Sequence, residues 1–426
     1  MASQHTPTWR TARFRWLNGL LAVLVVGGGP ALTAYAQDNQ ATYDAISEEI
    51  AEIRGLDLLE PIDVEVKTRQ ELQDETRSDL AADYPQADRD DDQRVLEAFG
   101  LIEPDQDLGD LYVNLLGEQI AGYYDPETNE MVVVASRDAN ELSASDQITF
   151  AHEVVHALQD QHYDLESYND IRLDGTSDQS LAVTALIEGD ATLAQIDFIL
   201  GDMRLARDFL AEIESEDIST EQLDSAPPII SQTLLFPYDQ GQVFTQFLYD
   251  EGGWDLIDDA YADPPTTTEQ ILHPEKYLDG DEEIEVATPD LAGILGADWR
   301  TIDEDTWGEF QISVLLADGG DLSDEQVSTA SEGWGGDAYA ATTSESGDAI
   351  LWQSEWDSAD DADEFAMALG NRQSVRLDAE ATSDDDTYTI EADDALVHIS
   401  VDGTSVTYVY APDEATLDVI LDEVGT

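Results

Sequence analysis

The sequence predicts an α+β protein, mainly helical with a small β-sheet in its larger N-terminal part and richer in strands in a smaller C-terminal part. Apolar residues recur at helical spacing in most segments before residue 280, where only three short runs have the pattern of strands. Strand patterns dominate after that position. A hydrophobic content of 42% over 426 residues is enough for sizeable cores, and the length favours two or three domains.

Charge is the outlying feature of the composition. The chain has 96 acidic and 17 basic residues, a formal net charge of -79. Because the acidic residues are spread along the whole chain, we interpret them as an adaptation to molar salt, in which the Debye length is about 3 Å. A surface for basic partners would concentrate the charge, and the same charge argues against nucleic acid as a partner. The chain has no cysteine, which excludes disulfides and thiol nucleophiles.

The first 36 residues have the pattern of a secretory signal peptide. Arg10, Arg13 and Arg15 precede an apolar run at residues 20–26, and a small-residue cleavage site ends at Ala36. We therefore expect cleavage after Ala36 and secretion. An uncleaved anchor is the alternative, but the apolar run is short for a membrane span. No later segment approaches membrane length, so we expect no stable span after cleavage.

Periodicity and turn residues define the elements that follow. The expected elements are, in order, a helix at 41–53, a half-buried strand at 62–67, a helix at 69–82, a solvated acidic loop at 88–92, and a hairpin of strands 119–124 and 130–134. The second arm of this hairpin lies directly upstream of the central motif. Its free edge can therefore present backbone groups to an extended peptide.

The central motif is the HEVVH segment that contains His152, Glu153 and His156. It lies in a predicted helix that follows a capping box of Ser143 and Asp146. Two histidines four residues apart project from one helix face and can offer two imidazole nitrogens to one metal ion. The glutamate beside them can accept a proton from water, which makes it the candidate general base. The alternative is an amphipathic helix with two incidental histidines on its polar side.

A long predicted helix at 180–200 carries Glu188 among apolar neighbours. A buried carboxylate needs a partner, and a metal ion would serve, although an ordinary exposed glutamate is an equal alternative from spacing alone. Gly189 costs a helix interior about 1 kcal/mol, which indicates that another segment approaches closely there. Tyr238 lies in a later helix and is by default a core aromatic. Further helices are expected at 203–213, 229–248 and 266–273.

The composition changes at 279–282, where Asp-Gly-Asp-Glu indicates a linker. The segments beyond it contain no constellation of chemically reactive residues. They are expected to form strands at 338–342, 349–356, 397–401 and 405–410, with amphipathic helices at 362–369, ended by Gly370, and at 417–421.

Three motifs, in this order along the chain, resemble those of the gluzincin metallopeptidases, most closely the catalytic core of the zinc aminopeptidase family. They are HEVVH, the EGDA sequence that begins at Glu188, and the PYDQG sequence that contains Tyr238. The resemblance covers roughly residues 119–277. Together with the N-terminal pattern and the change in composition, it gives the expected division of the chain: a signal peptide at 1–36, a zincin-like metallopeptidase domain at 37–280 and a C-terminal α+β accessory domain at 281–426.

The same resemblance assigns roles to individual residues. His152, His156 and Glu188 would bind Zn²⁺, Glu153 would act as general base, and Tyr238 would donate a hydrogen bond to the oxyanion. The substrate implied is a peptide or protein.

The sequence also departs from the family pattern. No GxMEN-type segment precedes the motif, so exopeptidase action is not supported and an endopeptidase-like activity is expected. Residues 164–178 form an insertion that we expect to be a loop. Thr192 stands where thermolysin-type relatives have an aspartate, so the residue that would hydrogen-bond to the metal-binding histidine is unassigned. His162 and His273 are alternative candidates for a ligand or an oxyanion donor.

Two other functions are compatible with the sequence. The chain can be a non-catalytic, salt-adapted surface or binding protein on a gluzincin scaffold with a structural metal, although Glu153 beside the histidines counts against it. Calcium buffering by the acidic residues ranks last, because no EF-hand loop is present. Substrate preference and oligomeric state stay open.

Overall fold

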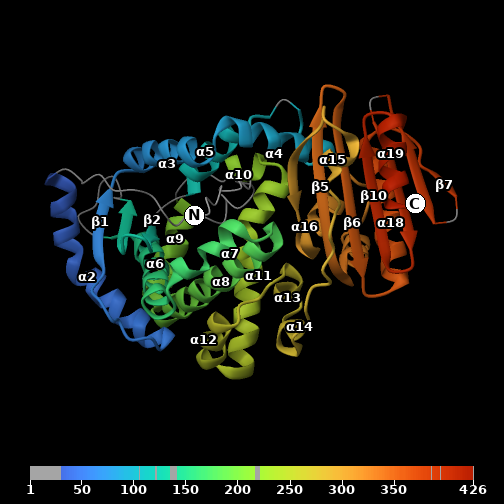
Figure 1. The fold of residues 1–426 in the computed structure, drawn as a ribbon. Coiled ribbons are helices and arrows are strands. Elements are labelled where there is room, and N and C mark those ends of the chain that lie inside the picture. The colour runs from blue at the N-terminus through green and yellow to red at the C-terminus, as the bar shows by residue number, and fades with distance from the viewer. Residues whose placement is uncertain are drawn as a thin grey trace, which may run out of the picture.

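The computed structural model describes residues 30–104, 106–119, 122–134, 142–215, 221–384, 386–393 and 395–425. The arginines and the apolar run of the predicted signal peptide lie outside the described residues, as do the side chains at its predicted cleavage site. The fold is α+β and mainly helical, as predicted. Figure 1 shows the small sheet with the N-terminal and central helices on one side of the molecule and the larger C-terminal sheet with its own helices on the other.

The N-terminal region contains a three-stranded sheet with strand order β1-β3-β2. The predicted hairpin is present, because β2 pairs antiparallel with β3, and β1 pairs with β3 in parallel. Strand β3 is therefore central, and the prediction that its edge is free is wrong; β1 and β2 are the edge strands. The elements of this region are α2 (Pro30–Arg54), β1 (Asp63–Lys67), α3 (Arg69–Asp83), α4 (Gln86–Phe99), α5 (Leu108–Gln119), β2 (Gly122–Asp125) and β3 (Glu130–Val134).

The central region is helical. The insertion that we expected to be a loop instead forms the short helices η1 and α7, because Leu165 and Tyr168 are buried in the core and anchor it. The elements are α6 (Ala144–Tyr163), η1 (Leu165–Tyr168), α7 (Asn169–Asp174), α8 (Ser177–Gly201), α9 (Met203–Ser215), α10 (Glu221–Ser225), α11 (Pro228–Gly252), α12 (Trp254–Ala262), α13 (Thr268–Leu272) and α14 (Pro274–Asp279).

The C-terminal region contains an antiparallel seven-stranded sheet with strand order β4-β5-β6-β10-β9-β8-β7. Alternate side chains along its strands face α16 and α18 on one face and α15 and α19 on the other. The elements are α15 (Leu291–Leu295), β4 (Arg300–Asp305), α16 (Gly308–Ala317), α17 (Asp324–Ser331), β5 (Trp334–Ser344), β6 (Gly347–Trp356), α18 (Ala359–Arg376), β7 (Thr382–Asp384), β8 (Thr387–Glu391), β9 (Leu396–Asp402), β10 (Ser405–Ala411) and α19 (Glu414–Val424).

Helix α18 continues past Gly370, where the sequence predicted its end. This glycine does not cap the helix; a Cβ on it would lie 3.3 Å from the ring of Tyr388, so the small residue makes room for packing against β8. A glycine near the end of an apolar pattern therefore has two interpretations, and the neighbouring strand decides between them.

The acidic stretch 88–92, predicted as a solvated loop, lies inside helix α4. Asp91 pairs with Arg300, with oxygen-to-nitrogen distances of 2.7 and 2.5 Å, and Asp92 accepts a 2.6 Å hydrogen bond from the Tyr84 hydroxyl. Both carboxylates are buried. The prediction failed because the residues that pair with these carboxylates come from other segments. Without those partners, the free-energy cost of burying two carboxylates would be too high.

One hydrophobic core runs from the central helices into the C-terminal sheet. It includes Leu186 of α8, Phe244 of α11 and Trp352 of β6. A second core joins α2, α6 and the small sheet, and it supports the helix that carries the HEVVH motif. The two regions that the composition separates at 279–282 are thus packed against each other.

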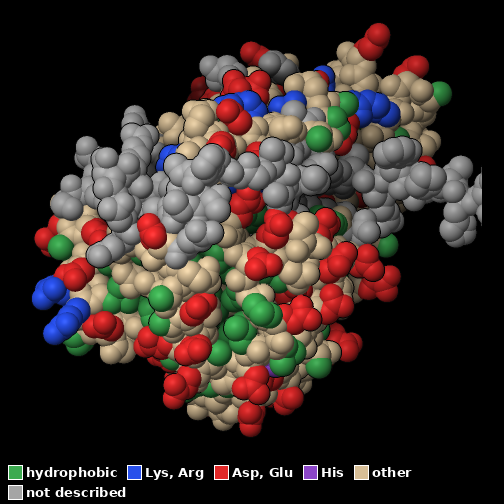
Figure 2. Space-filling model, turned by 90° about the vertical axis from the view of Figure 1, so that its left-hand side faces the viewer, with side chains coloured by type: hydrophobic (Ala, Val, Ile, Leu, Met, Phe, Trp, Pro, Cys, Tyr) green, Lys and Arg blue, Asp and Glu red, His purple; other side chains and the backbone are tan. Residues whose placement is uncertain are grey.

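The surface is strongly acidic. Figure 2 shows Asp and Glu side chains scattered over one face of the molecule with few Lys and Arg among them. Such a distribution agrees with the spread of charge along the sequence. Among the described residues, no helix is both long and apolar enough to cross a membrane.

Candidate metal centre

Helix α6 carries the HEVVH motif, and its start is held by two sets of hydrogen bonds. The predicted capping box is present, because the Ser143 side chain accepts from the Asp146 amide and the Asp146 side chain accepts from the Ser143 amide. Glu212 of α9 accepts from the amides of Ala144 and Ser145 at 2.9 and 2.8 Å. A carboxylate at the N-terminus of a helix also interacts favourably with the positive end of the helix dipole.

Helix α8 carries Glu188, and two glycines bring it against α11. A Cβ on Gly189 would lie 2.1 Å from the Gly241 carbonyl oxygen, and a Cβ on Gly241 would lie 2.2 Å from the Ala185 carbonyl oxygen. The two helices therefore meet backbone to backbone. This contact identifies the segment that the sequence predicted would approach Gly189, and it brings Tyr238 of α11 to the same region as Glu188.

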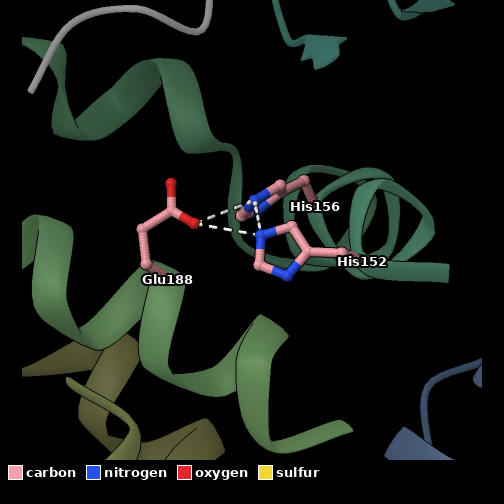
Figure 3. A group of neighbouring side chains, drawn as sticks. All are labelled: His152, His156 and Glu188. Atoms are coloured by element: carbon pink, nitrogen blue, oxygen red, sulfur yellow. Dashed lines mark hydrogen bonds and ion pairs between the residues drawn. The ribbon is translucent and has the colours of Figure 1, made fainter. Parts of the chain in front are cut away.

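His152, His156 and Glu188 form a buried group, the His/His/Glu cluster (Figure 3). The Glu188 Oε2 atom lies 3.1 Å from His152 Nε2 and 3.4 Å from His156 Nε2, and the two nitrogens are 3.1 Å apart. A point equidistant from the three atoms lies about 1.9 Å from each, close to zinc bond lengths of about 2.0–2.2 Å. The cluster can therefore hold a metal ion, and its donor set suits zinc and several other transition metals.

Within the cluster, the charges of His156 and Glu188 stabilise each other. Burial lowers the pKa of His156, but the Glu188 carboxylate outweighs burial and raises that pKa to about 9. Burial raises the pKa of Glu188, but the positive charge of His156 outweighs it and holds that pKa well below its ordinary value. The side chains thus favour an anionic carboxylate facing a cation.

Glu153 lies beside the cluster, where its carboxylate is held by β2, one of the two edge strands of the small sheet. Its Oε2 atom accepts a 3.0 Å hydrogen bond from the Tyr124 amide of β2. Burial raises the pKa of Glu153 above its ordinary value, despite the opposing charges of the two histidines. A carboxyl group with a raised pKa is better matched to accepting and returning a proton near neutral pH.

Tyr238 lies next to His152, with 6.0 Å between the two ring centroids. Its side chain is 43% exposed, so it is not the core aromatic of the default interpretation. The negative charge of Glu188 raises the pKa of Tyr238 well above its ordinary value. The phenol therefore stays protonated and can donate a hydrogen bond.

The sequence left the hydrogen-bond partner of the candidate metal-binding histidines unassigned, and the structure shows one for His156. The Nδ1 atom of His156 lies 2.8 Å from Gln159 Oε1, and Gln159 in turn contacts Asp190. Asp190 pairs with Arg54 of α2 at 2.6 Å. Gln159 follows His156 by three residues, so helical spacing could have revealed it, whereas nothing in the sequence connects Arg54 to this site.

A further residue that the sequence did not indicate is Arg172 of α7. It is buried near the cluster, where Glu188 and Tyr238 both act on its charge. Burial lowers the pKa of Arg172, and the charge of Glu188 opposes that effect. This arginine reaches the site because the expected loop is a pair of short helices.

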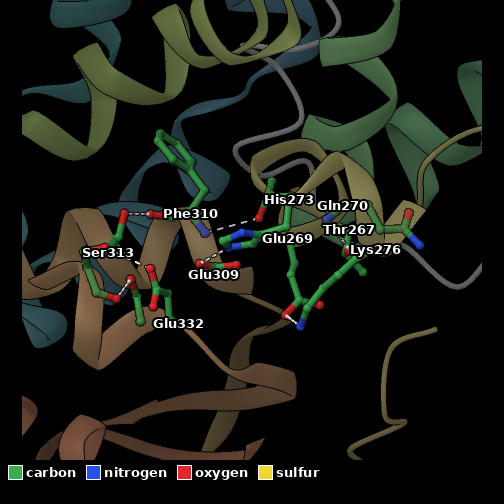
Figure 4. A network of polar contacts seen from close by, with 12 residues as sticks. Thr267, Glu269, Gln270, His273, Lys276, Glu309, Phe310, Ser313 and Glu332 are labelled. Carbon is green, nitrogen blue, oxygen red and sulfur yellow. Dashed lines mark hydrogen bonds and ion pairs between the residues drawn. The ribbon is translucent and has the colours of Figure 1, made fainter. Parts of the chain in front are cut away.

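His162 and His273, the alternative candidates, lie outside the His/His/Glu cluster. His162 is exposed and contacts the Asp57 carbonyl oxygen at 2.8 Å. His273 pairs with the buried Glu309 at 2.9 Å between α13 and α16, as Figure 4 shows. Both histidines therefore serve contacts between segments of the fold.

The described part of the chain is thus an α+β protein with a buried cluster of two histidines and one glutamate that can hold a metal ion. Residues 298–421 match the family model described as Domain of unknown function (DUF8575). This segment covers the seven-stranded sheet and contains none of the cluster residues. No curated protein and no solved structure matches the chain.

Proposed function

We propose that this protein is a secreted, zinc-dependent peptidase of endopeptidase-like action. The observation that carries the proposal is the convergence of three ligand atoms from His152, His156 and Glu188, with the carboxylate of Glu153 beside them. The order of the three sequence motifs supports the same conclusion. Export rests on the N-terminal sequence pattern alone.

Each residue has a defined task in peptide hydrolysis. A zinc ion held by the cluster would supply Lewis acidity toward a peptide carbonyl and a water molecule. Glu153 accepts a proton from the attacking water and later returns it to the leaving amine, and the Tyr124 amide keeps its carboxylate in place. Tyr238 donates a hydrogen bond to the oxyanion that develops on the carbonyl.

The test compares zinc content and casein hydrolysis in molar salt for the native protein and three variants. Glu153→Gln should keep its zinc and lose about 10²–10⁴-fold in kcat, the usual contribution of a general base. Tyr238→Phe should keep zinc and lose about 10²–10³-fold, because one oxyanion donor is removed. His156→Ala should lose the metal.

The matched control is Glu166→Gln, which removes an exposed carboxylate from η1 near the end of α6. This variant should keep both zinc and activity. If the native protein and Glu153→Gln both hold zinc and hydrolyse casein equally poorly, the peptidase proposal fails. The metal would then be structural.

A further inference from the structure

Gln159 follows His156 by one turn of α6, and its amide has a fixed orientation. Its Nε2 atom donates to the Ile187 carbonyl oxygen at 2.9 Å and to Asp190 Oδ2 at 3.0 Å. Both acceptors lack a hydrogen to give when Asp190 is ionised, so the nitrogen end of the amide must face them. The oxygen end therefore faces His156.

This orientation decides the tautomer of His156. The Nδ1 atom lies 2.8 Å from Gln159 Oε1, which can only accept, so Nδ1 carries the hydrogen. In the neutral imidazole, the form that binds a metal ion, the Nε2 atom is then left with its lone pair, and it is the atom that points at Glu188 and His152. Gln159 thus presents the imidazole in the form that a metal ion needs.

The far end of this chain of contacts is charged and fully buried. Asp190 accepts from Arg54 Nε at 2.6 Å and from the Tyr261 hydroxyl at 2.8 Å. Arg54 also pairs with Asp258 at 2.7 Å and lies over the Trp254 ring at 4.6 Å. The buried charge of Asp190 is therefore compensated, and the aspartate cannot turn without breaking several contacts.

We propose that Gln159 is a positioning residue for His156, held in place by the Asp190–Arg54 pair, so that helix α2 is a structural part of the metal centre. The inference rests on the metal binding proposed above. It assigns to a neutral amide the role that a carboxylate or a backbone carbonyl often fills behind a metal histidine. It also predicts that substitutions in α2 that disrupt the Asp190–Arg54 pair weaken metal binding, although α2 is far from the motif in sequence.

The test measures zinc affinity of the full-length protein by chelator competition in molar salt. Gln159→Leu should bind zinc about 10–100-fold more weakly, the usual effect of removing such a partner. The control is Gln161→Leu on the same helix, because Gln161 also makes three hydrogen bonds, to the backbone of Leu59 and Glu60, and makes none to the cluster. It should lower thermal stability and leave zinc affinity unchanged.

A second measurement needs no variant. In the zinc-loaded native protein with ¹⁵N-labelled histidine, the His156 resonances should show a protonated Nδ1 and a metal-bound Nε2. The reverse assignment, or unchanged zinc affinity in Gln159→Leu, overturns the role of Gln159 while metal binding stands. If the native protein holds no zinc or other divalent transition metal, the proposed function falls and this inference falls with it.

Discussion

The relative positions of Glu188 and Tyr238 depend on two glycines, residues that have no side chain. Gly189 and Gly241 let α8 and α11 touch along their backbones, at separations that no Cβ would permit. Where two helix backbones touch in this way, the protein interior can accommodate an added methyl group only by moving the helices or distorting side chains. The geometry of the site therefore depends on the absence of side chains at these two positions.

Gly241→Ala should lower the free energy of unfolding by about 1–3 kcal/mol, because the added methyl group meets the Ala185 carbonyl. It should also weaken zinc binding, since it displaces α8, the helix that carries Glu188. Denaturant unfolding and chelator competition measure the two effects. Gly201→Ala is the control: its methyl group would have its nearest neighbour, Glu49 Oε1, at 3.9 Å.

Because alanine favours a helix over glycine by about 1 kcal/mol, the Gly201→Ala control should be as stable as the native protein or slightly more stable. Equal stability of the Gly241→Ala variant and the native protein would show that α8 and α11 can relax freely. The close contact would then have no influence on the site.

Among the elements, α4 connects the helical region to the C-terminal sheet. Its last residue, Phe99, packs edge-on against Trp307 at 5.1 Å, Tyr339 at 5.4 Å and Trp352 at 5.8 Å. Arg376 of α18 donates to the Glu97 carbonyl oxygen at 2.8 Å, which satisfies the C-terminus of the helix. An element whose first half is almost entirely polar in sequence thus ends inside an aromatic core.

Phe99→Ala should lower the free energy of unfolding by about 3–5 kcal/mol, because it leaves a cavity among four aromatic rings. The near-ultraviolet circular dichroism should change as well, since the tryptophans lose their packing. Thermal and denaturant unfolding measure the loss. Phe247→Ala, in a half-buried position at the edge of the same core, should cost clearly less. A loss below about 1 kcal/mol for Phe99→Ala would show that α4 is not anchored to the sheet.

For the whole molecule, some of the many carboxylates lie in the interior, where they make the stability depend on pH. Burial raises the pKa of Asp337 to about 6 although it accepts four hydrogen bonds, and it raises the pKa values of Glu269 and Glu283 to about 7. Between the unfolded and the folded pKa, such a group binds more protons in the folded state. Its contribution to stability is therefore present at low pH and is lost as the pH rises through the folded value.

We expect the free energy of unfolding to fall from about pH 4.5 to about pH 7.5 at constant molar salt. The salt screens the surface charges, so the fall reports mainly the buried groups. Glu269→Gln should reduce the slope between pH 5 and 7, because it removes one of these protons. The exposed Glu275→Gln serves as control and should leave the slope unchanged. A native protein whose stability rises across this range would contradict the prediction.

Local patterns in the sequence determined a large part of this protein. The helical period and the capping box predicted α6 and the common face of its two histidines, and the strand alternation predicted the hairpin and much of the C-terminal sheet. The motif order also pointed to Glu188, which the fold brings to both imidazoles. These features depend on spacing along one element or on a motif, so a single chain reveals them.

Only the tertiary structure decided the features that join distant segments. It placed β3 in the centre of its sheet, turned the acidic stretch 88–92 into a helix, and set Arg54 behind the site through Asp190. The physical reason is the same in each case. Whether an edge is free, a carboxylate is buried or an aspartate meets an arginine from a distant helix depends on which faces meet in the folded chain, and local spacing contains no information about those faces.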